Sequence, residues 1–166
     1  NEIWRKYYGE NGISVFDEGN SVEETSDGGF ILAGQSQFSF GASTNDILLI
    51  KTDSTGESQW IKVIGGSGNQ GANSVKQTMD EGYIIAGTTY EDDGYIVKTD
   101  SNGEIIFEII ESNSRLHDVI ETSDGSYVVC GYVGSVNQSK RIYLIKLDSS
   151  GFQQWNKEFT GEQNYG

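Results

Sequence analysis

The stretch Thr25-Ser26-Asp27-Gly28-Gly29-Phe30-Ile31-Leu32-Ala33-Gly34 decides the fold, because the chain repeats its pattern twice more. The other copies are Thr78-Met79-Asp80-Glu81-Gly82-Tyr83-Ile84-Ile85-Ala86-Gly87 and Thr122-Ser123-Asp124-Gly125-Ser126-Tyr127-Val128-Val129-Cys130-Gly131. Asp and Gly tolerate positive φ, and aromatic and β-branched residues suit a pleated, half-buried surface. Each copy therefore predicts a tight turn that leads into a β-strand.

A second motif follows each copy and predicts a strand that leads into a turn. Its copies are Leu49-Ile50-Lys51-Thr52-Asp53-Ser54-Thr55-Gly56, Ile96-Val97-Lys98-Thr99-Asp100-Ser101-Asn102-Gly103 and Leu144-Ile145-Lys146-Leu147-Asp148-Ser149-Ser150-Gly151. An aromatic residue stands four positions after each final glycine, at Trp60, Phe107 and Trp155, and Trp4 occupies the same place in an incomplete leading copy. These aromatics recur at intervals of 47 to 56 residues. Strand-rich repeats of this length are typical of propeller blades.

Four strands are expected in each repeat. The inner strands are 21–25, 74–78 and 118–122, the second strands 30–33, 83–86 and 127–130, and the third strands 47–52, 95–99 and 142–147; the outer strands hold Trp60, Phe107 and Trp155. No segment has a sustained helical period or the length of apolar residues that a membrane span needs. We predict an all-β fold, a β-propeller segment of about three four-stranded antiparallel blades plus an extra N-terminal outer strand.

The expected organisation is a single repeat domain over residues 1–166. Residues 1–9 form the outer strand of a missing blade, 10–63, 64–111 and 112–160 form blades one to three, and 161–166 begin a fourth. Propellers close with about four to eight blades, so three cannot complete a ring. We expect the segment to belong to a longer chain; the alternative is closure by other copies of itself, since an open array exposes strand edges.

The stretch Ile50 to Trp60 resembles the tryptophan-docking motif of quinoprotein-like propellers, in which a turn glycine is followed four residues later by Trp. Gly56 with Trp60, Gly103 with Phe107 and Gly151 with Trp155 keep that spacing. The resemblance implies that these aromatics pack between neighbouring blades. The run from Asp27 to Gly34 looks like the uncharacterised repeats of large secreted bacterial and archaeal proteins. By that resemblance, the chain is expected to be extracellular or in the cell envelope.

The composition is acidic. The chain has 25 Asp and Glu against 11 Lys and Arg, for a formal net charge of −14. Because phosphate binding needs clustered Lys and Arg, nucleic acid and anionic membranes are not expected partners.

No catalytic constellation is recognised. Cys130 is the only cysteine and stands where the other copies have Ala33 and Ala86, so a small buried side chain is expected. His117 is the only histidine, and it aligns with Asn20 and Asn73 at the start of the inner strand. A zinc site or a Ser-His-Asp triad therefore lacks its partners. The recurring aspartates, such as Asp27 and Asp53, are explained by turns.

Non-recurring residues supply the candidate binding positions. Glu91, Asp92 and Asp93 form an acidic loop tip that could offer oxygens to calcium, although such tips are usually only solvated. Phe38 and Phe40 lie among small polar residues in the insertion 35–45, either as a contact surface or packed onto the blade edge. Tyr90 stands beside the acidic tip.

Three functions are compatible with these residues. The first is a non-catalytic scaffold or protein-interaction surface, with a protein or copies of itself as partner, without a cofactor. The alternative is a lectin-like glycan-binding module that uses Phe38, Phe40 and Tyr90. The third is a quinoprotein-like oxidoreductase, which would need a closed ring and a calcium-bound quinone.

Overall fold

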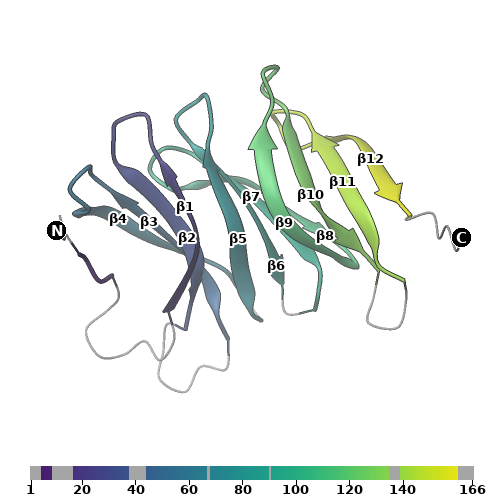
Figure 1. The fold of residues 1–166 in the computed structure, drawn as a ribbon, viewed down its shortest axis with the longest axis horizontal. Helices are drawn as coiled ribbons and strands as arrows, with labels where there is room; N and C mark the ends of the chain where they lie inside the picture. The colour runs from purple at the N-terminus through teal and green to yellow at the C-terminus, as the bar shows by residue number, and fades with distance from the viewer. Residues whose placement is uncertain are drawn as a thin grey trace, which may run out of the picture.

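A computed structural model describes residues 5–8, 17–37, 44–66, 68–89, 91–134 and 139–160. Within these residues it contains strands and no helix, arranged as three four-stranded antiparallel sheets (Figure 1). The first sheet consists of β1 (Asp17–Glu24), β2 (Phe30–Ser36), β3 (Asp46–Thr52) and β4 (Ser58–Ile64). The second consists of β5 (Gln70–Gln77), β6 (Tyr83–Thr89), β7 (Gly94–Thr99) and β8 (Ile105–Glu111). The third consists of β9 (Ser114–Glu121), β10 (Tyr127–Val133), β11 (Arg141–Leu147) and β12 (Gln153–Phe159).

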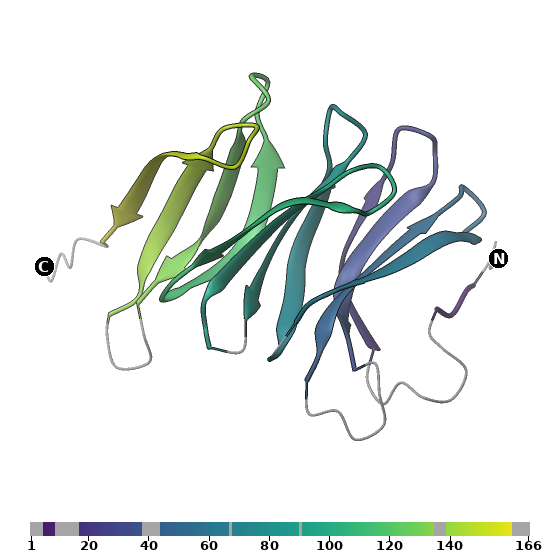
Figure 2. The ribbon, with the colours of Figure 1, turned by 180° about the vertical axis from the view of Figure 1, so that it is seen from behind.

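Each sheet is a meander in which consecutive strands are neighbours. The three sheets pack face to face in chain order, and both views show the first and third at opposite ends of an open array (Figures 1 and 2). The prediction of an all-β segment of three blade-like sheets is confirmed.

A β-bulge interrupts every inner strand at the same place. The register of β1 with β2 skips Asn20, that of β5 with β6 skips Asn73, and that of β9 with β10 skips His117. The bulge brings the inner strand so close that a Cβ on Gly87 would lie 2.1 Å from the Gly71 carbonyl oxygen. Gly34 and Gly131 meet the same constraint. Each second-strand Gly of the repeat is therefore required by the bulge opposite it.

The core lies between the sheets. Ile31, Ala33, Ile47, Leu49 and Ile64 of the first sheet pack against the second sheet. Ile84, Ala86 and Ile96 of the second sheet pack against the third. Because side chains alternate along a strand, each central strand presents one apolar row to the sheet before it and another to the sheet after it. The sequence consequently reads as nearly continuous apolar runs, such as Ile47 to Ile50.

One expectation needs correction, and another stays a prediction. Residues 5–8 are not part of a strand, and the assignment of residues 1–9 to the outer strand of a missing blade stays a prediction. Cys130 is only partly buried, whereas Ala33 and Ala86 are 1% and 0% exposed. Cys130 lies on the face of the third sheet that no other sheet of the described residues covers, so its position in the repeat does not bury it.

Across the described ranges, no helix has the length and apolarity to cross a membrane.

Candidate interaction surfaces

The interface between the first and second sheets is built around Trp60. Its ring meets the ring of Tyr83 edge-on, with the centroids 5.7 Å apart and the planes at 67°. A Cβ on Gly103 would lie 3.1 Å from two carbons of the Trp60 ring, and Gly103 has φ +78°. A turn glycine and a buried tyrosine of the second sheet thus form a socket for the aromatic residue of the first.

The interface between the second and third sheets repeats this socket. Phe107 packs against Tyr127, with a centroid distance of 6.3 Å. A Cβ on Gly151, which has φ +86°, would lie 3.0 Å from the Phe107 ring. The two interfaces are therefore two copies of one arrangement, as expected for stacked repeats that contact only their neighbours.

Hydrogen bonds from the bulge residues join neighbouring sheets, and this row of bonds is called here the seam. Asn20 Nδ2 donates a hydrogen bond of 3.0 Å to the carbonyl oxygen of Ala72, and Asn73 Nδ2 donates one of 2.7 Å to that of Leu116. The bulge turns each Asn toward the next sheet, where its amide satisfies a backbone carbonyl. His117 occupies the same bulge position in the third sheet and is exposed.

An ion pair joins the first and second sheets at the outer edge of their interface. Lys62 of β4 contacts Glu104 of the second sheet at 2.5 Å, and both side chains are substantially exposed. Such a pair contributes little free energy but helps to fix the register of the two sheets.

The outward face of the first sheet, called here the first end face, carries the residues that the later sheets bury. Val22 is 62% exposed, whereas its counterparts Val75 and Val119 are 0% and 1% exposed. The other members of the first end face are Phe30, Leu32, Leu48 and Ile50, by the alternation of side chains along β2 and β3.

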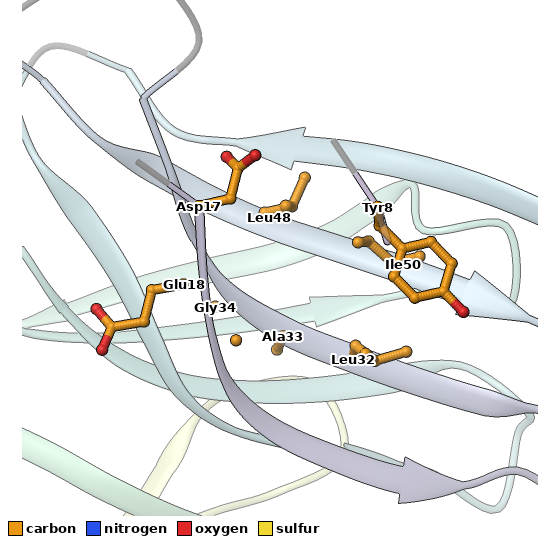
Figure 3. Close-up of a pocket in the computed structure, with 9 residues that line it drawn as sticks. Tyr8, Asp17, Glu18, Leu32, Ala33, Gly34, Leu48 and Ile50 are labelled. Atoms are coloured by element: carbon orange, nitrogen blue, oxygen red, sulfur yellow. The ribbon is translucent and has the colours of Figure 1, made fainter. Parts of the chain in front are cut away.

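Residues 5–8 cover part of the first end face. Tyr8 donates a hydrogen bond of 2.6 Å to the carbonyl oxygen of Gly56, and its ring stands over Ile50 (Figure 3). Lys6 forms an ion pair with Glu57. Between Tyr8 and the sheet remains an open pocket of about 190 Å³, lined mainly by apolar side chains that include Leu32 and Leu48. Lys6 with Glu57 reproduces the position of Lys62 with Glu104, since both glutamates directly follow the socket glycine.

The outward face of the third sheet, called here the last end face, has no cover among the described residues. Ile142 is 62% exposed, while Ile47 at the same position of the first sheet is 0% exposed. Trp155 is 39% exposed, and Phe159 is 49% exposed where its counterpart Ile64 is 4% exposed. Val128, Cys130 and Leu144 complete this face and are partly buried.

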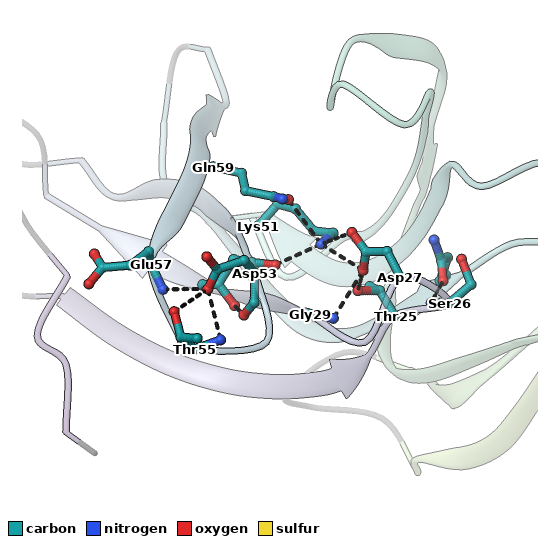
Figure 4. A network of polar contacts seen from close by, with 11 residues as sticks. Thr25, Ser26, Asp27, Gly29, Lys51, Asp53, Thr55, Glu57 and Gln59 are labelled. Carbon is teal, nitrogen blue, oxygen red and sulfur yellow. Dashed lines mark hydrogen bonds and ion pairs between the residues drawn. The ribbon is translucent and has the colours of Figure 1, made fainter. Parts of the chain in front are cut away.

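In every sheet, a lysine of the third strand binds the aspartate of the turn before the second strand. Lys51 Nζ contacts the Asp27 carboxylate at 2.8 Å and donates to the Thr52 carbonyl oxygen at 2.7 Å (Figure 4). The hydrogen bond that Lys51 donates to the Asp27 carboxylate, with those from Thr25 and the Gly29 amide, holds the pKa of Asp27 well below its usual range. The side chains of Lys51, Lys98 and Lys146 are 5%, 2% and 18% exposed. The last value is highest because no sheet among the described residues covers Lys146.

The predicted site residues are placed as follows. Phe38, Phe40, Tyr90 and Trp4 lie outside the described residues, so their roles stay predictions. Asp92 forms an ion pair with Arg115, and Asp93 accepts a hydrogen bond of 2.7 Å from the Asn113 backbone amide. Both acids therefore bind the third sheet or the turn that leads into it. In the part of the chain that the structure describes, no group of three His, Cys, Asp or Glu side chains is placed to hold a metal ion.

A polar pocket of about 290 Å³ lies where the first and second sheets meet at the bulge end of the array. Amide side chains dominate its lining, with two threonines and one acid: Glu18, Asn20, Gln35, Asn69, Gln70, Asn73, Thr88 and Thr89. Several of these amide groups form a hydrogen bond to the protein backbone through their nitrogen or their oxygen. Asn20 and Asn73 donate through nitrogen, and Asn69 accepts a hydrogen bond of 2.6 Å from the Asn45 backbone amide.

Sequence reasoning missed the recurring lysine and the bulge asparagines. A signal existed for the lysine, because Lys51, Lys98 and Lys146 stand at one repeat position after an apolar run. The asparagine pattern was visible at Asn20 and Asn73, but its meaning depends on the bulge.

Comparison with known proteins adds information on the fold alone. No family model matches the chain, and no curated protein matches it. A solved structure described as a crystal structure of the eukaryotic initiation factor is similar over 86% of this chain, with a TM-score of 0.55 and 13% sequence identity. This chain spans only 32% of that structure's length, and identity this low supports a shared architecture without a shared activity.

Proposed function

We propose that this chain is a non-catalytic propeller-type interaction module whose last end face binds a protein partner. The observation that carries the proposal is the exposure of Ile142, Trp155 and Phe159. Their counterparts in the first sheet belong to the core between the first and second sheets or pack against it: Ile47, Trp60 and Ile64. A contiguous apolar face with this geometry already binds a neighbouring sheet twice in the same molecule. Exposed patches of this kind mark interaction sites in soluble proteins.

The setting we propose is the cell envelope or the extracellular space, where the chain acts as a scaffold. The support is the resemblance of its Asp27 to Gly34 run to repeats of secreted bacterial and archaeal proteins, together with its net charge of −14. A strongly acidic surface keeps an exposed array soluble and disfavours anionic partners.

Site-specific photo-crosslinking in the cells that make the protein tests the interaction surface. The crosslinker replaces Ile142 on the last end face, and the matched control replaces Ile110 on β8, which is 60% exposed against 62% for Ile142. We expect a discrete intermolecular adduct from position 142 and none from position 110. Equal adducts from both positions, no adduct from position 142, or a crosslink confined within one polypeptide would overturn the proposal.

A second candidate function is binding of a neutral glycan in the amide-rich pocket. Amide groups and threonine hydroxyls suit sugar hydroxyls, because both kinds of group donate and accept hydrogen bonds. Saturation-transfer NMR against neutral oligosaccharides tests it. Thr88→Val in the pocket should abolish a signal that Ser54→Ala, in a turn at the opposite end of the strands, leaves unchanged; absence of any signal from the unmodified chain rejects this function.

A further inference from the structure

We propose that Asp46 and Gln70 bind a calcium ion in the space beside Gly65. The site lies where β3 begins and where the loop from β4 leads into β5. It goes beyond the proposed interaction function and does not involve either end face, because its residues belong to the first sheet, the start of the second sheet and the loop between them.

Asp46 carries a buried carboxylate oxygen without a hydrogen-bond partner. Within the described residues no donor reaches its Oδ1 atom, and no basic side chain forms an ion pair with it. Burial raises the pKa of Asp46, because desolvation disfavours the ionised form. Buried polar atoms in folded proteins nearly always have a partner, so this oxygen points to a ligand from solution: a water, a proton or a cation.

A second oxygen faces the same space. A Cβ built on Gly65 would lie 2.0 Å from Asp46 Oδ1 and 2.8 Å from Gln70 Oε1, so the two oxygens flank the position where other residues carry a side chain. Gln70 Oε1 also accepts a hydrogen bond of 3.3 Å from the Gly66 amide, which orients the oxygen toward the loop. An ionised carboxylate and an amide oxygen are both acceptors, so a cation or a donor between them makes their approach favourable.

The second sheet shows how the same repeat position is satisfied elsewhere. Asp93 corresponds to Asp46, since each stands five residues before the lysine of its third strand. Asp93 Oδ1 accepts a hydrogen bond of 2.7 Å from the backbone amide of Asn113, in the short connection from β8 to β9. The connection from β4 to β5 is longer and rich in glycine, over residues 65–69. The unpaired oxygen of Asp46 is therefore specific to this loop.

Calcium suits these donors. It takes about six to eight oxygen ligands at about 2.3–2.6 Å and tolerates irregular geometry, so side-chain oxygens can share the ion with backbone carbonyls and water. Magnesium requires nearly ideal octahedral geometry and gives up its water reluctantly. Because the site has a single carboxylate, we expect a Kd of about 10⁻⁴–10⁻³ M, as in extracellular calcium-binding modules. The net charge of −14 favours cations near the chain.

Calorimetric titration with calcium chloride, together with thermal unfolding in EDTA and in calcium, tests the proposal. For the unmodified chain we expect a single binding event and a rise in the midpoint of unfolding of roughly 3–5 °C at about ten times Kd. Asp46→Asn should abolish both responses. In EDTA this variant should unfold at the same temperature as the unmodified chain or higher, because it removes an unpaired buried charge.

The matched control removes one charge far from the site. Glu24→Gln lies at the opposite end of the first sheet, since Glu24 pairs with Phe30 and Asp46 with Ser36 at the two ends of β2. It should keep the full calcium response, which separates a bound ion from a general effect of calcium on an acidic surface.

Two neighbouring glycines test the space without a change of charge. Gly65→Ala places Cβ 2.0 Å from Asp46 Oδ1 and should abolish the calorimetric signal, whereas nothing lies within 4 Å of a Cβ on Gly66, so Gly66→Ala should bind calcium normally. Gly65 does not have the positive φ that would strain an alanine. Circular dichroism checks that both variants are folded before the titration.

Four results would overturn the proposal. The first is an unmodified chain without a calcium response, which would leave water or a proton as the ligand of Asp46. A proton would show itself as stability that rises in EDTA as the pH falls through the raised pKa of Asp46. The second is a response that survives in both Asp46→Asn and Gly65→Ala. The third is an equal loss in Glu24→Gln, and the fourth is a loss in Asp93→Asn as large as in Asp46→Asn, which would place the ion at the acidic loop tip.

Discussion

The contrast between the interior interfaces and the two end faces shows what a repeat position determines and what it does not. Val22, Val75 and Val119 share one position, and their exposures are 62%, 0% and 1%. Ala33 and Ala86 are buried, while Cys130 at the same position is not. Backbone features such as the bulge recur in every sheet, because they depend on contacts within a sheet. Burial recurs only where a neighbouring sheet is present.

This contrast makes the energetic role of the interface aromatics directly testable. Trp60→Ala should lower the free energy of unfolding by about 3–5 kcal/mol, because it empties the socket formed by Tyr83 and Gly103. Trp155→Ala should cost no more than about 1 kcal/mol, since Trp155 is 39% exposed and no sheet of the described residues packs against it. Urea denaturation of both variants, under conditions where the chain is monomeric, measures the difference. Equal losses would contradict the distinction between interior and end.

The bulge glycines should behave in the opposite way, with the same cost in all three sheets. Alanine at Gly34, Gly87 or Gly131 would place Cβ 1.8–2.1 Å from a backbone carbonyl oxygen of the inner strand. Relief of that overlap should cost about 1–3 kcal/mol at each position. Gly66→Ala is the control, because nothing lies within 4 Å of the added Cβ. Thermal unfolding that ranks Gly34 and Gly131 as neutral would show that the bulge depends on neighbouring sheets after all.

The sequence was sufficient to predict the strands because turn chemistry and alternation are local properties. The third strands were placed within one residue, for example 47–52 against the observed Asp46–Thr52. The inner strands were predicted to begin at 21, 74 and 118, immediately after Asn20, Asn73 and His117. The bulge at those residues shifts the alternation by one, so the first half of each inner strand did not look like a strand.

The surfaces were less predictable than the strands for a physical reason. The exposure of Cys130 depends on whether another sheet covers it, which no local pattern records. The seam formed by Asn20 and Asn73 requires the bulge geometry and the position of the next sheet. Phe38, Phe40 and Tyr90 were chosen by residue type, and their part in binding stays a prediction.

Substitution of the bulge residue should also lower stability more in an interior sheet than in the third sheet, by a smaller margin than substitution of the interface aromatic. Asn73→Ala removes the 2.7 Å hydrogen bond to the Leu116 carbonyl oxygen and should cost about 0.5–1.5 kcal/mol. His117→Ala in the third sheet should stay within about 0.5 kcal/mol, as for a surface residue. Urea unfolding of the two variants, with Asn20→Ala as a second interior case, measures the difference. A larger loss for His117 than for Asn73 would mean that the seam does not depend on a following sheet.

The smallest expected effect concerns the aspartate–lysine pairs, and it depends on pH. The pKa of Asp27 is lowered in the folded state by hydrogen bonds from Lys51, Thr25 and the Gly29 amide. An aspartate in the unfolded chain has a pKa of about 3.9, so the pair stabilises the fold fully above that value and loses its contribution as the pH falls below it. Asp27→Asn should therefore cost no more than about 1 kcal/mol at pH 7 and should flatten the loss of stability between about pH 4 and pH 2.

The corresponding substitution in the third sheet tests how the burial of the lysine affects the cost of removing its charged partner. Asp124 also has a lowered pKa, caused by hydrogen bonds from Thr122 and Lys146. Lys51 is 5% exposed and Lys146 is 18% exposed, so water can solvate Lys146 more readily when its partner loses charge. At pH 7, Asp124→Asn should consequently destabilise the fold less than Asp27→Asn. Both substitutions should reduce the loss of stability at acid pH. Urea titrations between pH 2 and pH 7 would measure how the stability of each variant depends on pH. A larger loss of stability at pH 7 for Asp124→Asn than for Asp27→Asn would show that the greater exposure of Lys146 does not lower the cost of leaving its charge unpaired.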